Sequence, residues 1–119
     1  MTTAYTQTLQ ITEQHTAFSL GSGTLPVFAT PALVAFMENT AMQLIELPEG
    51  KTSVGISIDV KHLKASPVGA AVRCTAQVES REDRKYTFRI IVVNSENEIV
   101  GTAIHERIVV DIERFMNKF

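Results

Sequence analysis

The chain has 119 residues, of which 45% are hydrophobic and 20% are charged, a balance typical of globular proteins that excludes a disordered chain. Its 11 Lys and Arg against 13 Asp and Glu leave no basic excess, which excludes broad binding to nucleic-acid phosphates. The single cysteine, Cys74, excludes an intrachain disulfide and a multi-cysteine metal site, and the length predicts one domain over residues 1–119.

The N-terminal stretch carries no recognisable targeting signal. Residues 1–12 are polar and threonine-rich, with neither a positive cluster nor an apolar core. No apolar run approaches the roughly 18 residues that a membrane span requires. Together with the lone cysteine, these features predict a cytoplasmic protein without a nucleic-acid or membrane partner.

The first half of the chain predicts a strand, a loop and a long helix. Residues 5–11 alternate between two faces, as a strand does, and residues 20–26 are punctuated by glycine and proline. Thr30-Pro31 is a helix-start signal, in which we expect Thr30 to be the N-cap and Pro31 the first helical residue. Apolar residues then recur at helical spacing and predict a helix over 31–46, which Pro48 and Gly50 end.

Four stretches of alternating hydrophobicity follow, with polar turns at 81–84 and 94–97. The apolar faces expected for these strands are Val54, Ile56, Ile58 and Val60; Val72, Cys74, Ala76 and Val78; Tyr86, Phe88, Ile90 and Val92; and residues 100–110. A short amphipathic tail, 112–119, ends the chain.

This order predicts an α+β fold in which a curved antiparallel sheet wraps around one central helix, in the order β-α-β-β-β-β. Short turns between the last four strands predict an antiparallel meander, and the apolar stripe of the helix has only the sheet to pack against. Because the strand 86–93 is apolar on both sides, we expect at least a homodimer, with a tetramer left open.

Three polar residues break their local patterns. Glu38 lies at the margin of the apolar helix stripe, either as a rim carboxylate, which the pattern alone favours, or as a base or nucleophile at a dry interface. His62 extends the apolar face of its strand, either as a hydrogen-bonded histidine at a sheet end or as a catalytic imidazole. Thr30 serves as a helix cap, or presents a hydroxyl where the positive helix terminus favours an oxyanion.

Thr30 and Glu38 are about 12 Å apart along the helix axis, too far for a direct contact. A single site using both therefore needs His62 or a partner chain to bridge them, which favours a site at a subunit interface.

His105 and Arg107 share one face of the last strand, and the usual interpretation of such a run is a solvated face. Arg107, however, lies among apolar residues, so we expect it partly buried and paired, able to anchor a phosphate or a carboxylate. The three histidines have no metal-ligand spacing, and no P-loop, GxSxG, HExxH, CxxC or dinucleotide motif is present, which predicts neither metal nor cofactor.

Three segments in register resemble the fluoroacetyl-CoA thioesterase-like family of hotdog fold. They are Val27-Phe-Ala-Thr-Pro-Ala-Leu-Val-Ala-Phe-Met-Glu-Asn-Thr-Ala41, Val54-Gly-Ile-Ser-Ile-Asp-Val-Lys-His62 and Gly101-Thr-Ala-Ile-His-Glu-Arg107. The resemblance covers roughly residues 20–115. It implies a hotdog homodimer that hydrolyses acyl-CoA thioesters at interface active sites.

By motif match, the resemblance implies that Thr30, Glu38 and His62 form the catalytic triad. It also implies that the backbone N–H of Gly55 lies near the thioester carbonyl and that Arg107 lies near the active site. Residues 21–26 lack the aromatic side chain that gates the site of the family prototype, so the acyl group stays open.

Three other functions compete with hydrolysis. A non-catalytic acyl-CoA or acyl-carrier binding module of hotdog fold would bind CoA esters without releasing thiol. A hotdog hydratase needs a differently placed His–Asp pair, and only Asp59 precedes His62 closely. A purely structural dimer would leave Glu38 and His62 without a role.

Overall fold

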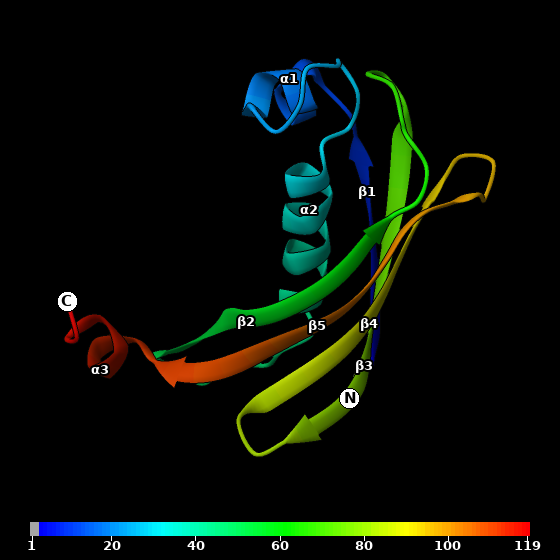
Figure 1. Cartoon of the computed structure of the whole chain (residues 1–119). Coiled ribbons are helices and arrows are strands. Elements are labelled where there is room, and N and C mark those ends of the chain that lie inside the picture. Colours follow the sequence, from blue (N-terminus) through cyan, green and yellow to red (C-terminus); the bar gives the residue numbers. More distant parts are fainter. Residues whose placement is uncertain (1–2) are drawn as a thin grey trace.

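The computed structural model describes residues 3–119 as one curved antiparallel sheet around a helix (Figure 1). The main elements are β1 (Ala4–Gln10), α2 (Thr30–Met42), β2 (Lys51–His62), β3 (Ala71–Glu82), β4 (Lys85–Asn94) and β5 (Ile99–Asp111). Short helical segments add η1 (Glu13–His15), α1 (Ala17–Leu20) and α3 (Ile112–Met116). The predicted α+β fold with one central helix is confirmed.

The strand order is β1-β3-β4-β5-β2, so the meander covers only β3, β4 and β5. The expected four-strand meander is wrong for β2, which pairs with β5 at the edge of the sheet. Residues 63–70 carry the chain from β2 to β3, and backbone hydrogen bonds from Phe28 to Ser66 and between Ile11 and Ala70 anchor this crossing. β2 is therefore an edge strand along its full length.

The core lies between α2 and the concave face of the sheet. Leu33, Met37 and Ala41 of α2 are fully buried there. The sheet contributes Val72, Cys74, Ala76, Phe88, Ile90, Val92 and Val100, which confirms the predicted faces of β3 and β4. Burial of each large apolar side chain contributes about 1.5–3 kcal/mol, so this interface holds α2 at a defined place on the sheet.

Both ends of α2 differ from the prediction. Ala29, not Thr30, is the N-cap, because the carbonyl of Ala29 accepts the first helical hydrogen bond from Leu33 N–H, at 2.9 Å. The helix ends at Met42 rather than at residue 46. Leu44 and Ile45 leave the helix in tight turns, and both are buried, so core packing overrides their helical spacing.

A β-bulge in β2 changes which residues face the helix. The register with β5 shifts between Gly55 and Ser57, so Ile56 is the extra residue and is 51% exposed. Ile58 and His62 share the helix-facing side with Gly55, whereas Val54 falls on the opposite side. The predicted face of Val54, Ile56, Ile58 and Val60 is therefore wrong in its first half.

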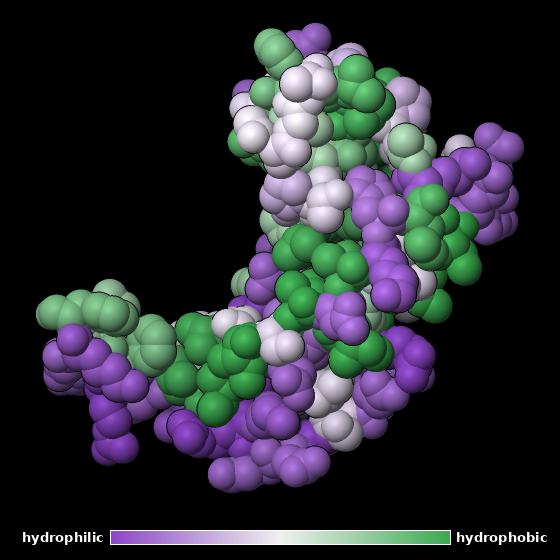
Figure 2. All heavy atoms as spheres, in the orientation of Figure 1, coloured by the Kyte–Doolittle hydropathy of each residue, from purple (hydrophilic) through white to green (hydrophobic). Residues whose placement is uncertain are grey.

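The space-filling view shows a molecule hollowed between the end that carries α1 and the arm that ends in α3 (Figure 2). Hydrophobic side chains gather at the α1 end and along the middle of this face. Within residues 3–119, no helix is long and apolar enough to cross a membrane.

Candidate active site

The first turn of α2 and the last residue of β2 bring Thr30 and His62 together. Thr30 Oγ1 lies 2.8 Å from His62 Nδ1, a hydrogen bond in which the hydroxyl either donates or accepts. The edge of the His62 ring packs near Phe28, with ring centroids 6.1 Å apart. The structure thus joins a hydroxyl to an imidazole, the arrangement in which a base activates a nucleophile.

His62 is held as a neutral base with one unused nitrogen. Burial lowers the pKa of His62 below its ordinary value of 6.5. The Lys64 backbone raises this pKa, but by less than burial lowers it. Nε2 is buried without a hydrogen-bond partner. An unsatisfied buried polar atom costs about 1–3 kcal/mol, so this ring is not placed for stability alone.

A pocket of about 310 Å³ opens beside this pair, a size typical of the smaller ligand sites. Thr30 and His62 line it together with Ala17, Ser22, Val27, Phe28, Ala29 and Ala65. Polar groups of Ser22, Thr30 and His62 and apolar groups of the other residues share this lining, so the reactive pair borders a space of mixed polarity.

A second cluster surrounds Glu38 of α2. Arg107 Nη1 lies 3.4 Å and His105 Nε2 lies 3.7 Å from Glu38 Oε2. Arg107 also donates from Nε to Ser53 Oγ, at 2.9 Å, and from Nη2 to the Ser53 carbonyl, at 3.1 Å. The guanidinium therefore holds a half-exposed carboxylate, whose side chain is 38% accessible, at the helix-facing side of β2.

Gly55 makes this approach of Glu38 to the strand sterically feasible. A Cβ at Gly55 would lie 2.5 Å from Glu38 Oε2 and 3.2 Å from His105 Cε1. Only a glycine leaves room for the carboxylate beside the backbone. The bulge at the next residue places Gly55 opposite Arg107 and on the same face.

The predicted site residues thus fall into two groups within one protomer. Thr30 and His62 form one, and Glu38, Gly55 and Arg107 form the other. No hydrogen bond or ion pair between described residues joins the two groups. The expectation that Arg107 is buried and paired is confirmed, since it is 7% exposed and contacts Glu38.

Two residues of the second cluster were missed in the sequence. His105 was expected on a solvated face, and this is wrong, because it is 1% exposed and lies against Phe88. The signal was available, since His105 is in phase with the buried residues Ala103 and Arg107. Ser53 had no such signal, because the bulge in β2 decides which face it occupies.

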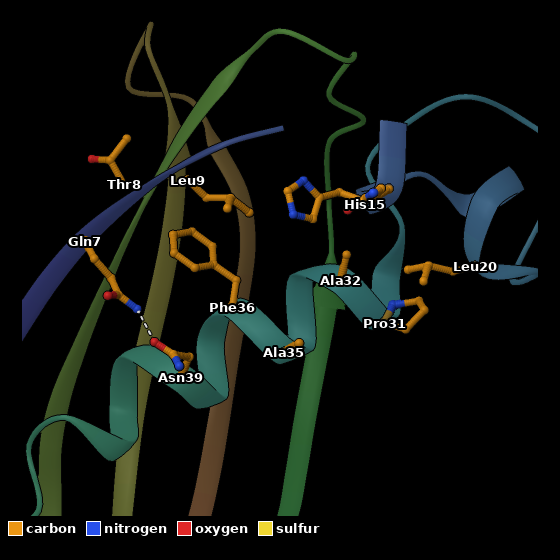
Figure 3. Close-up of a pocket in the computed structure, with 11 residues that line it drawn as sticks. Gln7, Thr8, Leu9, His15, Leu20, Pro31, Ala32, Ala35, Phe36 and Asn39 are labelled. Atoms are coloured by element: carbon orange, nitrogen blue, oxygen red, sulfur yellow. Dashed lines mark hydrogen bonds between the residues drawn. The ribbon is translucent and has the colours of Figure 1, made fainter. Parts of the chain in front are cut away.

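The larger cavity lies elsewhere, between α2 and β1, with a volume of about 550 Å³ (Figure 3). Leu9, Phe36 and Pro31 are among the apolar groups that line it, and Gln7 donates a hydrogen bond to Asn39 at its border. It contains none of the predicted catalytic residues. Among residues 3–119, no three His, Cys, Asp or Glu side chains are grouped to hold a metal ion.

The sequence profile of the fluoroacetyl-CoA-specific thioesterase family, FlK, matches residues 11–113. The chain is 36% identical over 94 residues to the fluoroacetyl-CoA thioesterase of Streptantibioticus cattleyicolor, which is 77% of this chain and 67% of that protein.

Two solved structures are similar along almost the whole chain. One is a mutant of the thioesterase FlK in complex with fluoroacetate and CoA, with TM-score 0.89, 28% identity, and 97% of this chain and 99% of that chain covered. The other is a hot-dog-like protein from Thermanaerovibrio acidaminovorans, with TM-score 0.89, 24% identity, and 98% and 87% covered. The second likeness concerns the fold alone and confirms the hotdog architecture.

Proposed function

We propose that this chain, which belongs to the fluoroacetyl-CoA-specific thioesterase family and is an acyl-CoA thioesterase, has its active site between two copies of the chain. There it hydrolyses an acyl-CoA to a carboxylic acid and free CoA. The observation that supports the chemical mechanism is the 2.8 Å contact between Thr30 Oγ1 and His62 Nδ1 in the lining of a pocket of about 310 Å³. Residues 1–119 would act as one thioesterase domain. A cytoplasmic, reducing environment would keep the buried Cys74 thiol free.

In the first step, His62 accepts the Thr30 proton while Thr30 Oγ1 attacks the thioester carbonyl. The C–S bond breaks, the acyl group passes to Thr30, and the CoA thiolate takes the proton from His62. Neutral His62 is suited to this role because burial lowers its pKa. Gly55 N–H would donate to the developing oxyanion, a contribution typically worth about 3–4 kcal/mol.

In the second step, Glu38 would accept a proton from the water that hydrolyses the acyl-Thr30 ester. Both groups that contact this carboxylate approach Oε2, which leaves Oε1 to the water. Arg107 would take part through Glu38, because its Nε, Nη1 and Nη2 are all engaged with groups of its own chain. The ester C–O bond to Thr30 then breaks, the proton passes from Glu38 to Thr30 Oγ1, and the carboxylic acid is released.

A second copy of the chain would bring the two groups of residues together. β2 is an edge strand of 12 residues that pairs with β5 on one side only within residues 3–119, with Gly55 near one end and His62 at the other. An antiparallel pairing of β2 with the β2 of a partner, around a twofold axis near Ile58 and Asp59, sets His62 of one copy beside Gly55 and Glu38 of the other. Each dimer would then hold two composite sites.

The first experiment measures CoA release with a thiol-reactive dye across acyl-CoA substrates of increasing chain length. We expect turnover by the wild-type chain, and a loss of at least about a hundredfold in Glu38→Gln and in His62→Ala, the usual scale for acid–base residues. Glu46→Gln is the matched control, because Glu46 lies beyond the end of α2. Full activity in both site variants, with unchanged circular dichroism, would remove them from the mechanism.

The second experiment tests whether the site is shared. Glu38→Gln and His62→Ala chains are mixed and allowed to exchange subunits. If each site uses Glu38 of one chain and His62 of the other, mixed dimers regain one intact site, and random exchange restores about a quarter of the wild-type activity. If each site lies within a single chain, mixing restores none.

A further inference from the structure

His105 is buried in the second cluster and makes one hydrogen bond with each ring nitrogen. Nδ1 lies 2.8 Å from the Ser57 carbonyl, and Nε2 lies 3.2 Å from Arg107 Nη1. A carbonyl can only accept and a guanidinium can only donate. Nδ1 therefore carries the proton and Nε2 carries the lone pair, which makes the ring neutral and fixes its tautomer.

Because of this tautomer, the short distance between His105 and Glu38 does not indicate an ion pair. The Nε2 lone pair already accepts from Arg107, so it has no proton for the carboxylate at 3.7 Å. Arg107 is then the only cation paired with Glu38 among residues 3–119. Desolvation on burial lowers the pKa of His105 and keeps the ring neutral near pH 7.

The guanidinium of Arg107 is consequently held from two sides. Ser53 accepts from Nε and Nη2 on one side, and His105 accepts from Nη1 on the other. With these positions occupied, Nη1 is directed at Oε2 of Glu38, at 3.4 Å. No described residue donates a hydrogen bond to Oε1, and the Glu38 side chain is partly exposed.

From this geometry we propose that His105 is a positioning residue for the thioesterase reaction. As a neutral hydrogen-bond acceptor, His105 orients Arg107. Arg107 then holds one carboxylate oxygen of Glu38 and leaves the other oxygen for water. The proposal rests on the proposed function, in which Glu38 activates the hydrolytic water. The side chain of His105 itself touches neither substrate nor water.

The charged groups that face His105 are two carboxylates and one guanidinium. Glu38 approaches from α2, Arg107 and Glu106 lie on β5, β2 contributes the Ser57 carbonyl, and β4 contributes the ring of Phe88. Protonation of Nε2 would set a cation against Arg107 and disrupt the hold on Glu38. Acid should therefore lower activity through this ring.

Two amide variants separate the two hydrogen bonds of the ring. The Gln amide reaches the place of Nε2, so His105→Gln can still accept from Arg107, whereas the shorter Asn amide of His105→Asn reaches only the Ser57 carbonyl. We expect His105→Asn to lower kcat by about tenfold or more with KM within about twofold, since misplacing a reacting group is costly. His105→Gln should stay within about threefold of wild-type kcat.

Equal losses of kcat in the two variants would overturn the proposal, because packing alone would then explain the residue. A double variant separates this result from failure of the proposed function. In a Glu38→Gln chain, His105→Asn should add less than about a twofold further loss, because both changes act on the same carboxylate. Full activity of Glu38→Gln alone would refute the proposed role of Glu38, whereas a loss there with an active His105→Asn would refute only the role of His105.

The tautomer is also measurable in the unaltered protein, and a variant is needed only to assign its signal. Two-bond ¹H–¹⁵N spectra of the imidazole rings at pH 7 should show His105 as the neutral Nδ1–H form, which is the minor tautomer of free histidine. The signal is assigned by its absence in His105→Gln. A protonated ring, or the Nε2–H form, would overturn the proposed orientation of Arg107.

Discussion

Thr30 and His62 are 32 residues apart in the chain, yet Thr30 Oγ1 lies 2.8 Å from His62 Nδ1. This contact takes the hydroxyl away from the helix terminus, where Ala29 is the cap and no side-chain capping bond forms. The hydroxyl is thus placed by the partner across the fold and not by the helix that carries it. Its removal should affect chemistry more than stability.

We therefore expect Thr30→Ala to lower CoA release by at least about a hundredfold. Its melting temperature should stay near that of the wild type, because no cap bond worth about 1 kcal/mol is lost. Thr30→Ser keeps Oγ and should retain most of the activity. A Thr30→Ala chain that is active but less stable would show that the hydroxyl has only a structural role.

Gly55→Ala should displace the Glu38 carboxylate. The new Cβ would lie 2.5 Å from Oε2, at the end of a side chain that can move, so the fold should survive. Activity should fall by about tenfold or more, since the carboxylate no longer meets the water correctly. Adding Gly55→Ala to a Glu38→Gln chain should cause little further loss, and independent, multiplying losses would contradict the steric explanation.

Stability should decrease on acidification below about pH 6.5. Burial lowers the pKa of both His62 and His105 from the ordinary value of 6.5, so between that value and the lowered ones the unfolded chain binds more protons than the folded chain. Their contribution is complete above pH 6.5 and is lost as the pH falls through the lowered values. Urea unfolding from pH 8 to pH 5 measures this, and His105→Gln should show a shallower decrease.

Cys74 should not react with thiol reagents while the protein is folded. Desolvation raises the pKa of this buried thiol to about 11, against a hydrogen bond from Thr40 that lowers it. At pH 8 the thiolate is therefore scarce as well as inaccessible. Titration with a thiol-reactive dye should detect one thiol per chain only after unfolding. Rapid labelling of the native protein would refute this, and would also interfere with the CoA-release assay.

Gly101→Ala should destabilise the fold through overpacking between α2 and the sheet. A Cβ there would lie 2.9 Å from Leu33 Cδ2 and 3.0 Å from the Lys61 carbonyl oxygen. The backbone oxygen cannot move freely, so we expect a loss of about 1–3 kcal/mol in the free energy of unfolding. Urea denaturation measures it, and an unchanged midpoint would mean that the helix shifts without cost.

Much of the fold was predictable because it follows from local patterns. The faces of β3 and β4 and the central helix were predicted from periods of 2 and 3.6 residues, which depend only on how neighbouring side chains project. Three pattern-breaking residues, Thr30, Glu38 and His62, were singled out in the same way, and the structure places each beside another polar group of the candidate site.

What local patterns could not supply were the features set by long-range pairing. The edge position of β2 depends on the crossing at 63–70. The bulge at Ile56 inverts the faces of the strand on either side of it, and for this reason the sequence did not predict that Ser53 belongs to the site. Amino-acid order alone thus specifies the strands, the helix and the reactive residue types, whereas their contacts depend on which strands pair and in what register, because a shift of one residue exchanges the two faces of a strand.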